Sequence, residues 1–172
     1  MKVLVTAASK HGSTAQIAEA ICEAMRRRGT DCRIMPIEKV KSLEEWDAVL
    51  LGSAVYAGRW MKAARQLVNV HGEELRKRPV WLFSSGPVGE PLAPGRSPEL
   101  DKMTEATGAR EHKLFPGNID RQVLTIGERA IVSSLKAPTG DFRDFNQIRQ
   151  WAIGVSDQLH AIKQARVGSL VG

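Results

Sequence analysis

Short apolar runs alternate with longer amphipathic stretches along most of the chain. The first run, Val3, Leu4 and Val5, is uniformly apolar, as expected for a strand that is buried on both faces of a sheet. A polar turn follows, and after it apolar residues recur at helical spacing, at Ile17, Ala18, Ile21, Cys22 and Met25. The pattern therefore predicts a strand, a turn and a helix at the start of the chain.

The same alternation continues to the end of the chain. Further strands are expected at residues 32–37, 47–53, 80–84 and 111–115. Helices are expected at residues 60–76 and 98–107, within part of 119–135, and from Asp144 to near His160. Asp144 and Gln147 resemble a capping box that opens the last helix. Residues 87–98 are rich in proline and glycine and are expected to form a loop.

Five strands that alternate with helices predict one α/β domain, a doubly wound parallel sheet with helices on both faces. We expect this domain to span residues 1–163 and residues 164–172 to form a C-terminal tail. Ligands of such sheets bind at the carboxyl ends of the strands. The loops at residues 9–14, 53–60 and 84–89 should therefore converge on one site.

The first of these loops has the composition of an anion site. It places Ser9, Ser13 and Thr14 between a buried strand and a helix N-terminus, where unpaired N–H groups and the helix dipole favour negative charge. Gly12 lets the backbone approach a ligand closely, and Lys10 adds positive charge. The alternative is that Ser13 or Thr14 only caps the helix.

The other two loops suit a flat ring that forms hydrogen bonds. They read Gly-Ser-Ala-Val-Tyr-Ala-Gly-Arg-Trp from Gly52 and Ser-Ser-Gly-Pro-Val-Gly from Ser84, so both are small and nearly uncharged. Their backbone amides can address ring heteroatoms, with Tyr56 or Trp60 as an apolar wall. The alternative for both aromatic residues is ordinary packing near a strand end.

Composition narrows the class of protein and its partners. The 172 residues are 42% hydrophobic and 26% charged, as in soluble globular domains, and no signal pattern opens the chain. Two cysteines without metal-like spacing are expected to be buried thiols in a reducing cytoplasm. The net charge of +6 favours anionic small molecules, an anionic membrane surface or an acidic protein. No nucleic-acid-binding motif accompanies this charge.

Several common chemistries lack their motifs in this sequence. It has no GxGxxG after a strand, no GxxxxGK[ST] and no GxSxG. The first strand ends in Thr6, Ala7 and Ala8, without the carboxylates of an aspartate phosphoacceptor, and the loop that follows has no cysteine for a thiol phosphatase. Of the chemistries considered for this site, the one that remains is the binding of a phosphorylated aromatic cofactor.

At this point the chain resembles the flavodoxin family, through the hydroxyl-rich turn Ser-Lys-His-Gly-Ser-Thr directly after the first strand. It looks closest to the branch that includes the menaquinone-dependent protoporphyrinogen dehydrogenases, because of the loop that runs from Gly52 and Ser53 to Gly58 and the apolar insertion at residues 119–135. The resemblance implies a flavodoxin-like sheet of order 2-1-3-4-5 and one bound FMN.

The resemblance also assigns residues to the cofactor. The phosphate would lie on the first loop, at Ser9, Lys10, His11, Gly12, Ser13 and Thr14. The isoalloxazine would be bordered by Ala54, Val55, Tyr56, Ala57 and Gly58 and by Ser85, Gly86, Pro87, Val88 and Gly89. His11 stands where flavodoxins usually place Ser or Thr, and it either donates to the phosphate or points to solvent. The last loop lacks the aromatic residue that many flavodoxins stack on the flavin.

Three functions follow from this reading. The first is an FMN-dependent oxidoreductase of the protoporphyrinogen dehydrogenase type, or a relative that acts on a quinone or another small molecule. The second is a flavodoxin-type electron carrier for a protein partner, although such carriers are typically acidic. The third is a flavin-free interaction module on the same fold.

Two groups of residues bear on the partner. Arg59, Lys62 and Arg65 either attract an anionic substrate or are solvated positions on a helix. The insertion at residues 119–135 offers apolar residues to a substrate, to a membrane surface or to a second copy in a homodimer.

Overall fold

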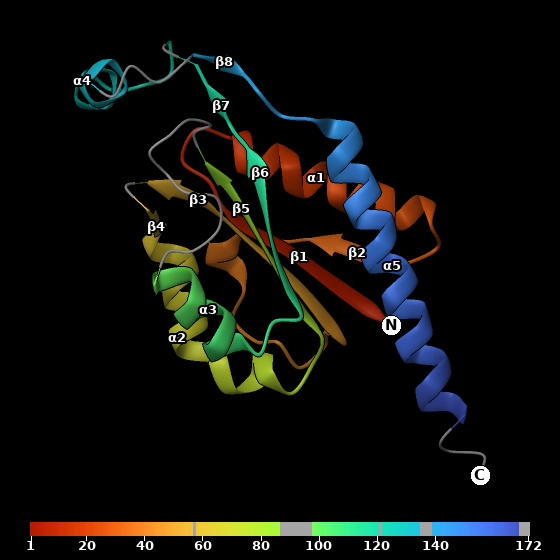
Figure 1. The fold of residues 1–172 in the computed structure, drawn as a ribbon. Coiled ribbons are helices and arrows are strands. Elements are labelled where there is room, and N and C mark those ends of the chain that lie inside the picture. The colour runs from red at the N-terminus through yellow and green to blue at the C-terminus, as the bar shows by residue number, and fades with distance from the viewer. Residues whose placement is uncertain (57, 87–97, 121, 135–138, 169–172) are drawn as a thin grey trace.

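The structure, a computed structural model, describes residues 1–56, 58–86, 98–120, 122–134 and 139–168. A central parallel sheet runs through the molecule in the order β2-β1-β3-β5-β6 (Figure 1). Its strands are β1 (Lys2–Ala8), β2 (Asp31–Ile34), β3 (Ala48–Tyr56), β5 (Val80–Gly86) and β6 (Glu111–Pro116). The predicted fold and strand order are confirmed, since β5 and β6 are the fourth and fifth predicted strands.

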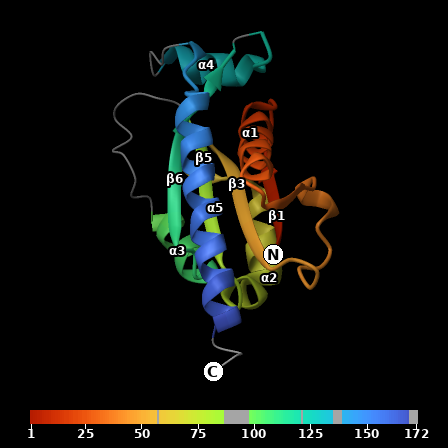
Figure 2. The same cartoon turned by 90° about the vertical axis from the view of Figure 1, so that its right-hand side faces the viewer.

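Helices cover both faces of this sheet. On one face lie α1 (Ser13–Arg27) and α5 (Phe145–Gly168), and Figure 2 views the molecule from the side of α5. On the other face lie α2 (Lys62–Arg76), α3 (Pro98–Thr107) and the short 3-10 helix η1 (Ile37–Lys39). Strand residues alternate between two buried cores, so that Val3 and Val5 pack with α1 and α5 while Leu4 packs with α2.

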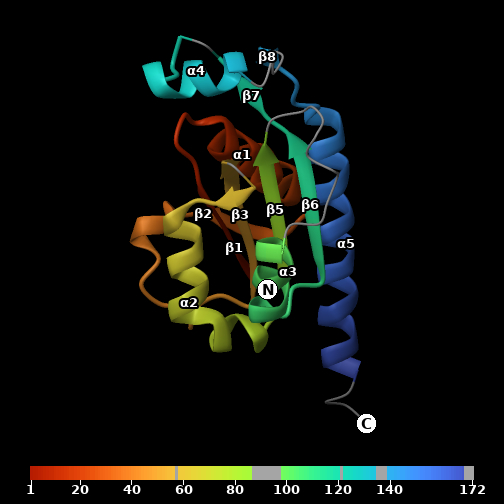
Figure 3. The same ribbon diagram turned by 60° about the vertical axis from the view of Figure 1, so that its left-hand side comes forward.

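Two further ladders extend from the carboxyl ends of the strands. β4 (Arg59–Trp60) pairs antiparallel with the end of β3. β7 (Asn118–Ile119) and β8 (Gly140–Asp141) form a separate two-stranded ladder, and α4 (Ile126–Ser134) lies between them in sequence. Figure 3 shows α4 beyond the carboxyl ends of β5 and β6, away from the main sheet. We call the segment from β7 to β8 the β7–β8 arm.

The predicted helices agree with the structure except at two ends. The helix expected from residue 60 begins at Lys62, because Trp60 pairs with Val55 in β4. α3 has the predicted bounds, and α4 confirms a partly helical insertion. The expected end of the last helix near His160 was wrong, because α5 continues to Gly168. Ile162 still packs on the core, and Gln164, Ala165 and Arg166 are good helix formers. The predicted loop before Pro98 lies outside the described residues.

The second strand is shorter than expected. β2 ends at Ile34, just before Pro36, which cannot donate to the ladder. Cys22 and Cys32 are both buried and free, as predicted. Among the described helices, none is long and apolar enough to cross a membrane.

Candidate functional site

The turn between β1 and α1 leaves the N-terminus of α1 open. Gly12 precedes the helix in the left-handed region, at φ 82° and ψ −16°, and no side chain caps this helix end. The alternative in which Ser13 or Thr14 caps α1 is therefore wrong, since both residues lie inside the helix. The first-turn N–H groups of α1 are available to an anion.

The two hydroxyl residues at the start of α1 differ in their surroundings. Thr14 is buried, whereas Ser13 is partly exposed. The Ser13 Oγ accepts a hydrogen bond of 3.2 Å from the backbone N–H of Asn118. A hydroxyl that accepts one bond still has its own hydrogen to donate. Ser13 is therefore the better placed of the two to donate toward a bound phosphate.

The predicted ring loop after β3 is mostly a β-hairpin. Strand β3 continues to Tyr56, and the register pairs Val55 with Trp60 and Tyr56 with Arg59. Gly58 turns the chain at φ 74°, a conformation that glycine adopts without strain. The expectation that β3 ends at Ser53 and that residues 53–60 form a loop was wrong for the paired positions. We call this unit the β3–β4 hairpin.

The turn between β1 and α1 and the β3–β4 hairpin meet at the edge of the sheet. The Lys10 Nζ lies 6.0 Å from the centre of the Tyr56 ring, and Tyr56 is 41% exposed. This is the distance of a cation–π contact. The two loops converge as predicted.

The end of β5 adjoins the same hairpin. A Cβ on Gly86 would lie 3.4 Å from the Val55 Cβ, and Ser85 pairs with Ala54 in the ladder. Gly117 follows β6 closely, because its N–H donates to the Gly86 carbonyl at 2.9 Å. The candidate residues Ala57, Pro87, Val88 and Gly89 lie outside the described residues.

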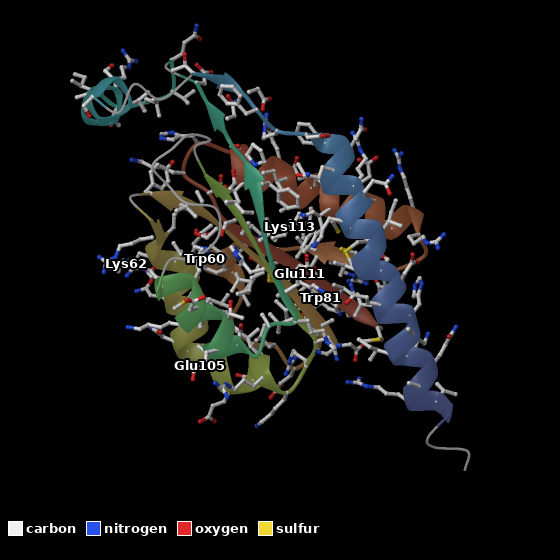
Figure 4. The ribbon with its side chains drawn as sticks, viewed as in Figure 1. Trp60, Lys62, Trp81, Glu105, Glu111 and Lys113 are labelled. Atoms are coloured by element: carbon white, nitrogen blue, oxygen red, sulfur yellow. The ribbon has the colours of Figure 1, made fainter. Side chains whose placement is uncertain are left out.

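Trp60 is a core residue and not a ligand wall. It is 2% exposed, and its Nε1–H donates to the Ser84 Oγ at 2.8 Å. The Ser84 Oγ lies 2.7 Å from the His112 Nε2. Figure 4 labels Trp60, close to the sheet, and Lys62, which points outward from α2. Of the two aromatic candidates, only Tyr56 is exposed.

His112 completes this buried polar chain. Burial lowers the pKa of its imidazole, and the nearby Glu111 carboxylate opposes that shift. The Ser84 hydroxyl can accept from the Trp60 indole and donate to the Nε2 of a neutral His112 at the same time. Sequence reasoning missed this role, since the three partners come from separate elements. The one local signal was the serine pair that ends an apolar strand.

Two of the three cations proposed as substrate attractors are paired. The Arg59 Nε lies 3.2 Å and the Arg65 Nε 3.6 Å from carboxylate oxygens of Glu99 on α3. These pairs tie α3 to α2 and the β3–β4 hairpin. The structure therefore favours a structural role for both arginines, and Lys62 is exposed.

Arg143, which follows β8, was not anticipated. Its guanidinium binds both carboxylate oxygens of Asp141 at 2.6 and 2.7 Å, and its side chain is 6% exposed. It also reaches the Gln16 Oε1 at 2.5 Å and the Ser13 carbonyl at 3.5 Å. The hydrogen bond from Arg143 lowers the pKa of the Asp141 carboxyl. Its contacts with α1 have no local signal in the sequence, because they join residues well over a hundred positions apart.

The strand order and the open helix at the carboxyl edge define a flavodoxin-like α/β protein. The chain belongs to the Flavodoxin domain family, which matches residues 4–146. No curated protein sequence matches it.

Solved structures agree on the fold. A flavodoxin from the domain Archaea superposes with a TM-score of 0.66 at 15% identity, over 93% of this chain and 99% of that one. Oxidised Flavodoxin 2 from Bacillus cereus gives 0.65 at 19% identity, over 92% and 99%. Rubredoxin oxygen:oxidoreductase from Desulfovibrio gigas gives 0.64 at 14% identity, over 93% of this chain but 36% of that one.

Proposed function

We propose that this chain binds FMN at the carboxyl edge of its sheet and acts as a redox protein. The observation that carries the proposal is the meeting of an open helix N-terminus with the β3–β4 hairpin, at Lys10 and Tyr56. FMN, when bound, supplies hydride or single-electron transfer. The protein's own residues hold the cofactor, orient it and control access to it.

The residues present fit such a cofactor. An open first turn with the Ser13 hydroxyl offers donors to a phosphate dianion. The residues Ala54, Ser85 and Gly86 at the ends of β3 and β5 are small, which suits the close approach of a planar ring beside Tyr56. Ser9 and His11 adjoin the same turn as candidate donors.

The first experiment is a titration of the purified protein with FMN, followed by flavin absorbance and fluorescence. Wild type should shift the flavin bands on binding. Ser13→Ala should raise the Kd roughly tenfold or more, because a hydrogen bond to a charged group is lost. Ser42→Ala, in a loop outside the site, is the control and should leave the Kd unchanged. A wild-type protein that binds no FMN, even when refolded with it, contradicts the proposal.

We further propose a two-electron oxidoreductase of the protoporphyrinogen dehydrogenase type, linked to a quinone in the cytoplasm or at a membrane surface. The β7–β8 arm supports this reading, since Val123 is 50% and Ile126 87% exposed beyond the strand ends. The net charge of +6 suits an anionic substrate. An electron carrier for a protein partner is the second candidate, favoured by the flavodoxins among the similar structures.

These two functions separate in one assay series. An oxidoreductase of the first kind should couple protoporphyrinogen oxidation to quinone reduction in multiple turnovers. Ile126→Glu should lower that rate and leave FMN bound. Val70→Glu, at another highly exposed apolar position, on α2, should leave the rate unchanged. An inactive wild type that exchanges electrons with a redox protein would favour the carrier. If Ile126→Glu instead changes the oligomeric state, the arm serves a homodimer.

A further inference from the structure

The β7–β8 arm is fastened to the first turn of α1 by two residues. Asn118, in β7, donates its backbone N–H to the Ser13 Oγ at 3.2 Å. Arg143, just after β8, reaches the Gln16 Oε1 at 2.5 Å and the Ser13 carbonyl at 3.5 Å. The two attachments are themselves joined, because Asn118 pairs with Asp141 in the ladder and Asp141 binds Arg143. The contacts form a closed ring around Ser13.

Within this ring, Asn118 contacts the Ser13 hydroxyl directly, and Asp141 and Arg143 tie Asn118 to the backbone of Ser13. The bond from Asn118 occupies one lone pair of the oxygen, so the hydroxyl hydrogen must point elsewhere. The Arg143 side chain is nearly buried and binds both carboxylate oxygens of Asp141 through Nε and Nη2, which fixes the orientation of its guanidinium and aims Nη1 at α1. Its guanidinium also lies over the Phe145 ring, 5.0 Å from the ring centre, in a cation–π contact.

The charge of Arg143 contributes little to attraction of an anion, because Asp141 neutralises it at hydrogen-bond distance. The contribution of the ring is therefore geometric. A hydroxyl that is already oriented loses less conformational freedom when it donates to a ligand. This advantage exists only for a ligand that has an acceptor at the open end of α1.

We infer that Asn118 and Arg143 are positioning residues for the cofactor phosphate, and that the root of the β7–β8 arm is part of the phosphate site. The inference rests on the proposed FMN function and extends it to residues outside the three flavin loops. The inference requires that disrupting these contacts weakens the binding of FMN, which has the phosphate. The binding of riboflavin, which has the same isoalloxazine without the phosphate, should be unchanged.

The test compares Kd values for FMN and riboflavin, measured by quenching of flavin fluorescence. Arg143→Met should raise the Kd for FMN about tenfold and change the Kd for riboflavin by less than about twofold. Arg143→Lys keeps the charge but loses the planar guanidinium. Its Kd for FMN should be much closer to that of Arg143→Met than to that of wild type. Arg149→Met is the matched control, because Arg149 also lies over the Phe145 ring, at 5.9 Å, yet is exposed and outside the ring of contacts.

A second measurement uses the wild-type protein alone, so it does not depend on whether a variant folds. Hydrogen exchange of the Asn118 amide should slow at least threefold when FMN saturates the protein, relative to saturation with riboflavin. Equal loss of both ligands in Arg143→Met, no loss of either, or an Asn118 amide that exchanges equally in both complexes would overturn the inference while FMN binding stands. A wild type that binds neither flavin removes this inference together with the proposed function.

Discussion

The two sides of the candidate site are held in place by different means. The turn between β1 and α1 is supported by polar contacts near the surface, at Ser13, Asn118 and Arg143. The β3–β4 hairpin is supported from beneath by the buried Trp60, whose indole reaches Ser84 inside the sheet. Changes on the hairpin side should therefore reduce the stability of the fold, whereas changes at the turn should chiefly reduce affinity for the cofactor.

The largest effect is expected at Gly52, in the strand that leads into the hairpin, on the face of the sheet that packs with α1 and α5. A Cβ at this position would fall on the ring of Phe83, which is fully buried in the next strand. Gly52→Ala should lower the free energy of unfolding by about 3 kcal/mol, because neither the backbone nor the ring has room to move. Urea unfolding, followed by tryptophan fluorescence, measures this change.

Two variants check the cause of that loss. Gly154→Ala, in α5, meets nothing within 4 Å and should be neutral or slightly stabilising, since alanine favours a helix. Phe83→Leu should recover part of the stability in the Gly52→Ala background. If Gly52→Ala is as stable as wild type, the Phe83 ring does not pack as closely against Gly52 as the structure shows.

The next effect concerns the hydrogen bond from Trp60. Trp60 and Trp81 are both buried, but only the Trp60 indole donates to a described partner, since the Trp81 Nε1 has none. Phenylalanine at either position removes similar volume. Trp60→Phe should therefore cost about 1–2 kcal/mol more than Trp81→Phe, the difference being the lost bond to Ser84. Equal losses in urea unfolding would mean that the Trp60–Ser84 bond contributes nothing.

The turn should respond differently at Gly12. Alanine there would meet no atom within 4 Å, but it would have to adopt φ 82°. The left-handed conformation costs an ordinary residue about 1–2 kcal/mol. Gly12→Ala should lose about 1 kcal/mol of stability and, because the open helix end is distorted, a larger share of its FMN affinity. Parallel unfolding and FMN titrations measure the two losses.

Gly29→Ala supplies the control, since Gly29 has φ 85° and open space around it but lies far from the turn. It should lose similar stability and keep its FMN affinity. If both variants bind FMN equally, the geometry at Gly12 is not part of the site.

The features that the sequence predicted are mostly those set by local pattern. Elements that depend on local pattern were found, such as the apolar run at β1 and the α2 face of Ala64, Leu67, Val68 and Leu75, all of which are buried. Strand order followed from the resemblance and from the rules of parallel sheets. The end of α5 was not predicted, because its last turns show little apolar periodicity beyond Ile162, which packs on the core.

Contacts between distant segments were beyond such reasoning. The sequence allows Trp60 either to contact a ligand or to pack near a strand end. The structure shows packing, because Trp60 is buried where Ser84 and His112 approach it from other strands. Arg143 was missed altogether, since its partner Gln16 lies at the other end of the chain. The sequence shows what a residue can bind, but the tertiary fold decides which partners come within reach.

The smallest effect expected is a pH dependence that differs between the two sides. Burial lowers the pKa of His112, so the unfolded chain takes up a proton that the folded chain resists. Stability from this group is thus complete above the ordinary histidine pKa of about 6.5 and falls as the pH drops below it. Asp141 also has a lowered pKa, but its contribution is lost only as the pH falls below about 4. Loosening between pH 7 and pH 5 should therefore begin on the hairpin side.

His112→Gln tests this order, because glutamine can still accept the Ser84 hydrogen bond but does not titrate. Wild type should lose more stability than the variant between pH 7.5 and pH 5.5, as measured by urea unfolding at each pH. Every other titrating group is common to both proteins, so the difference between the two curves belongs to His112. Parallel curves would mean that its imidazole titrates as freely in the folded protein as in the unfolded chain, and that the buried Trp60–Ser84–His112 chain does not depend on a neutral histidine.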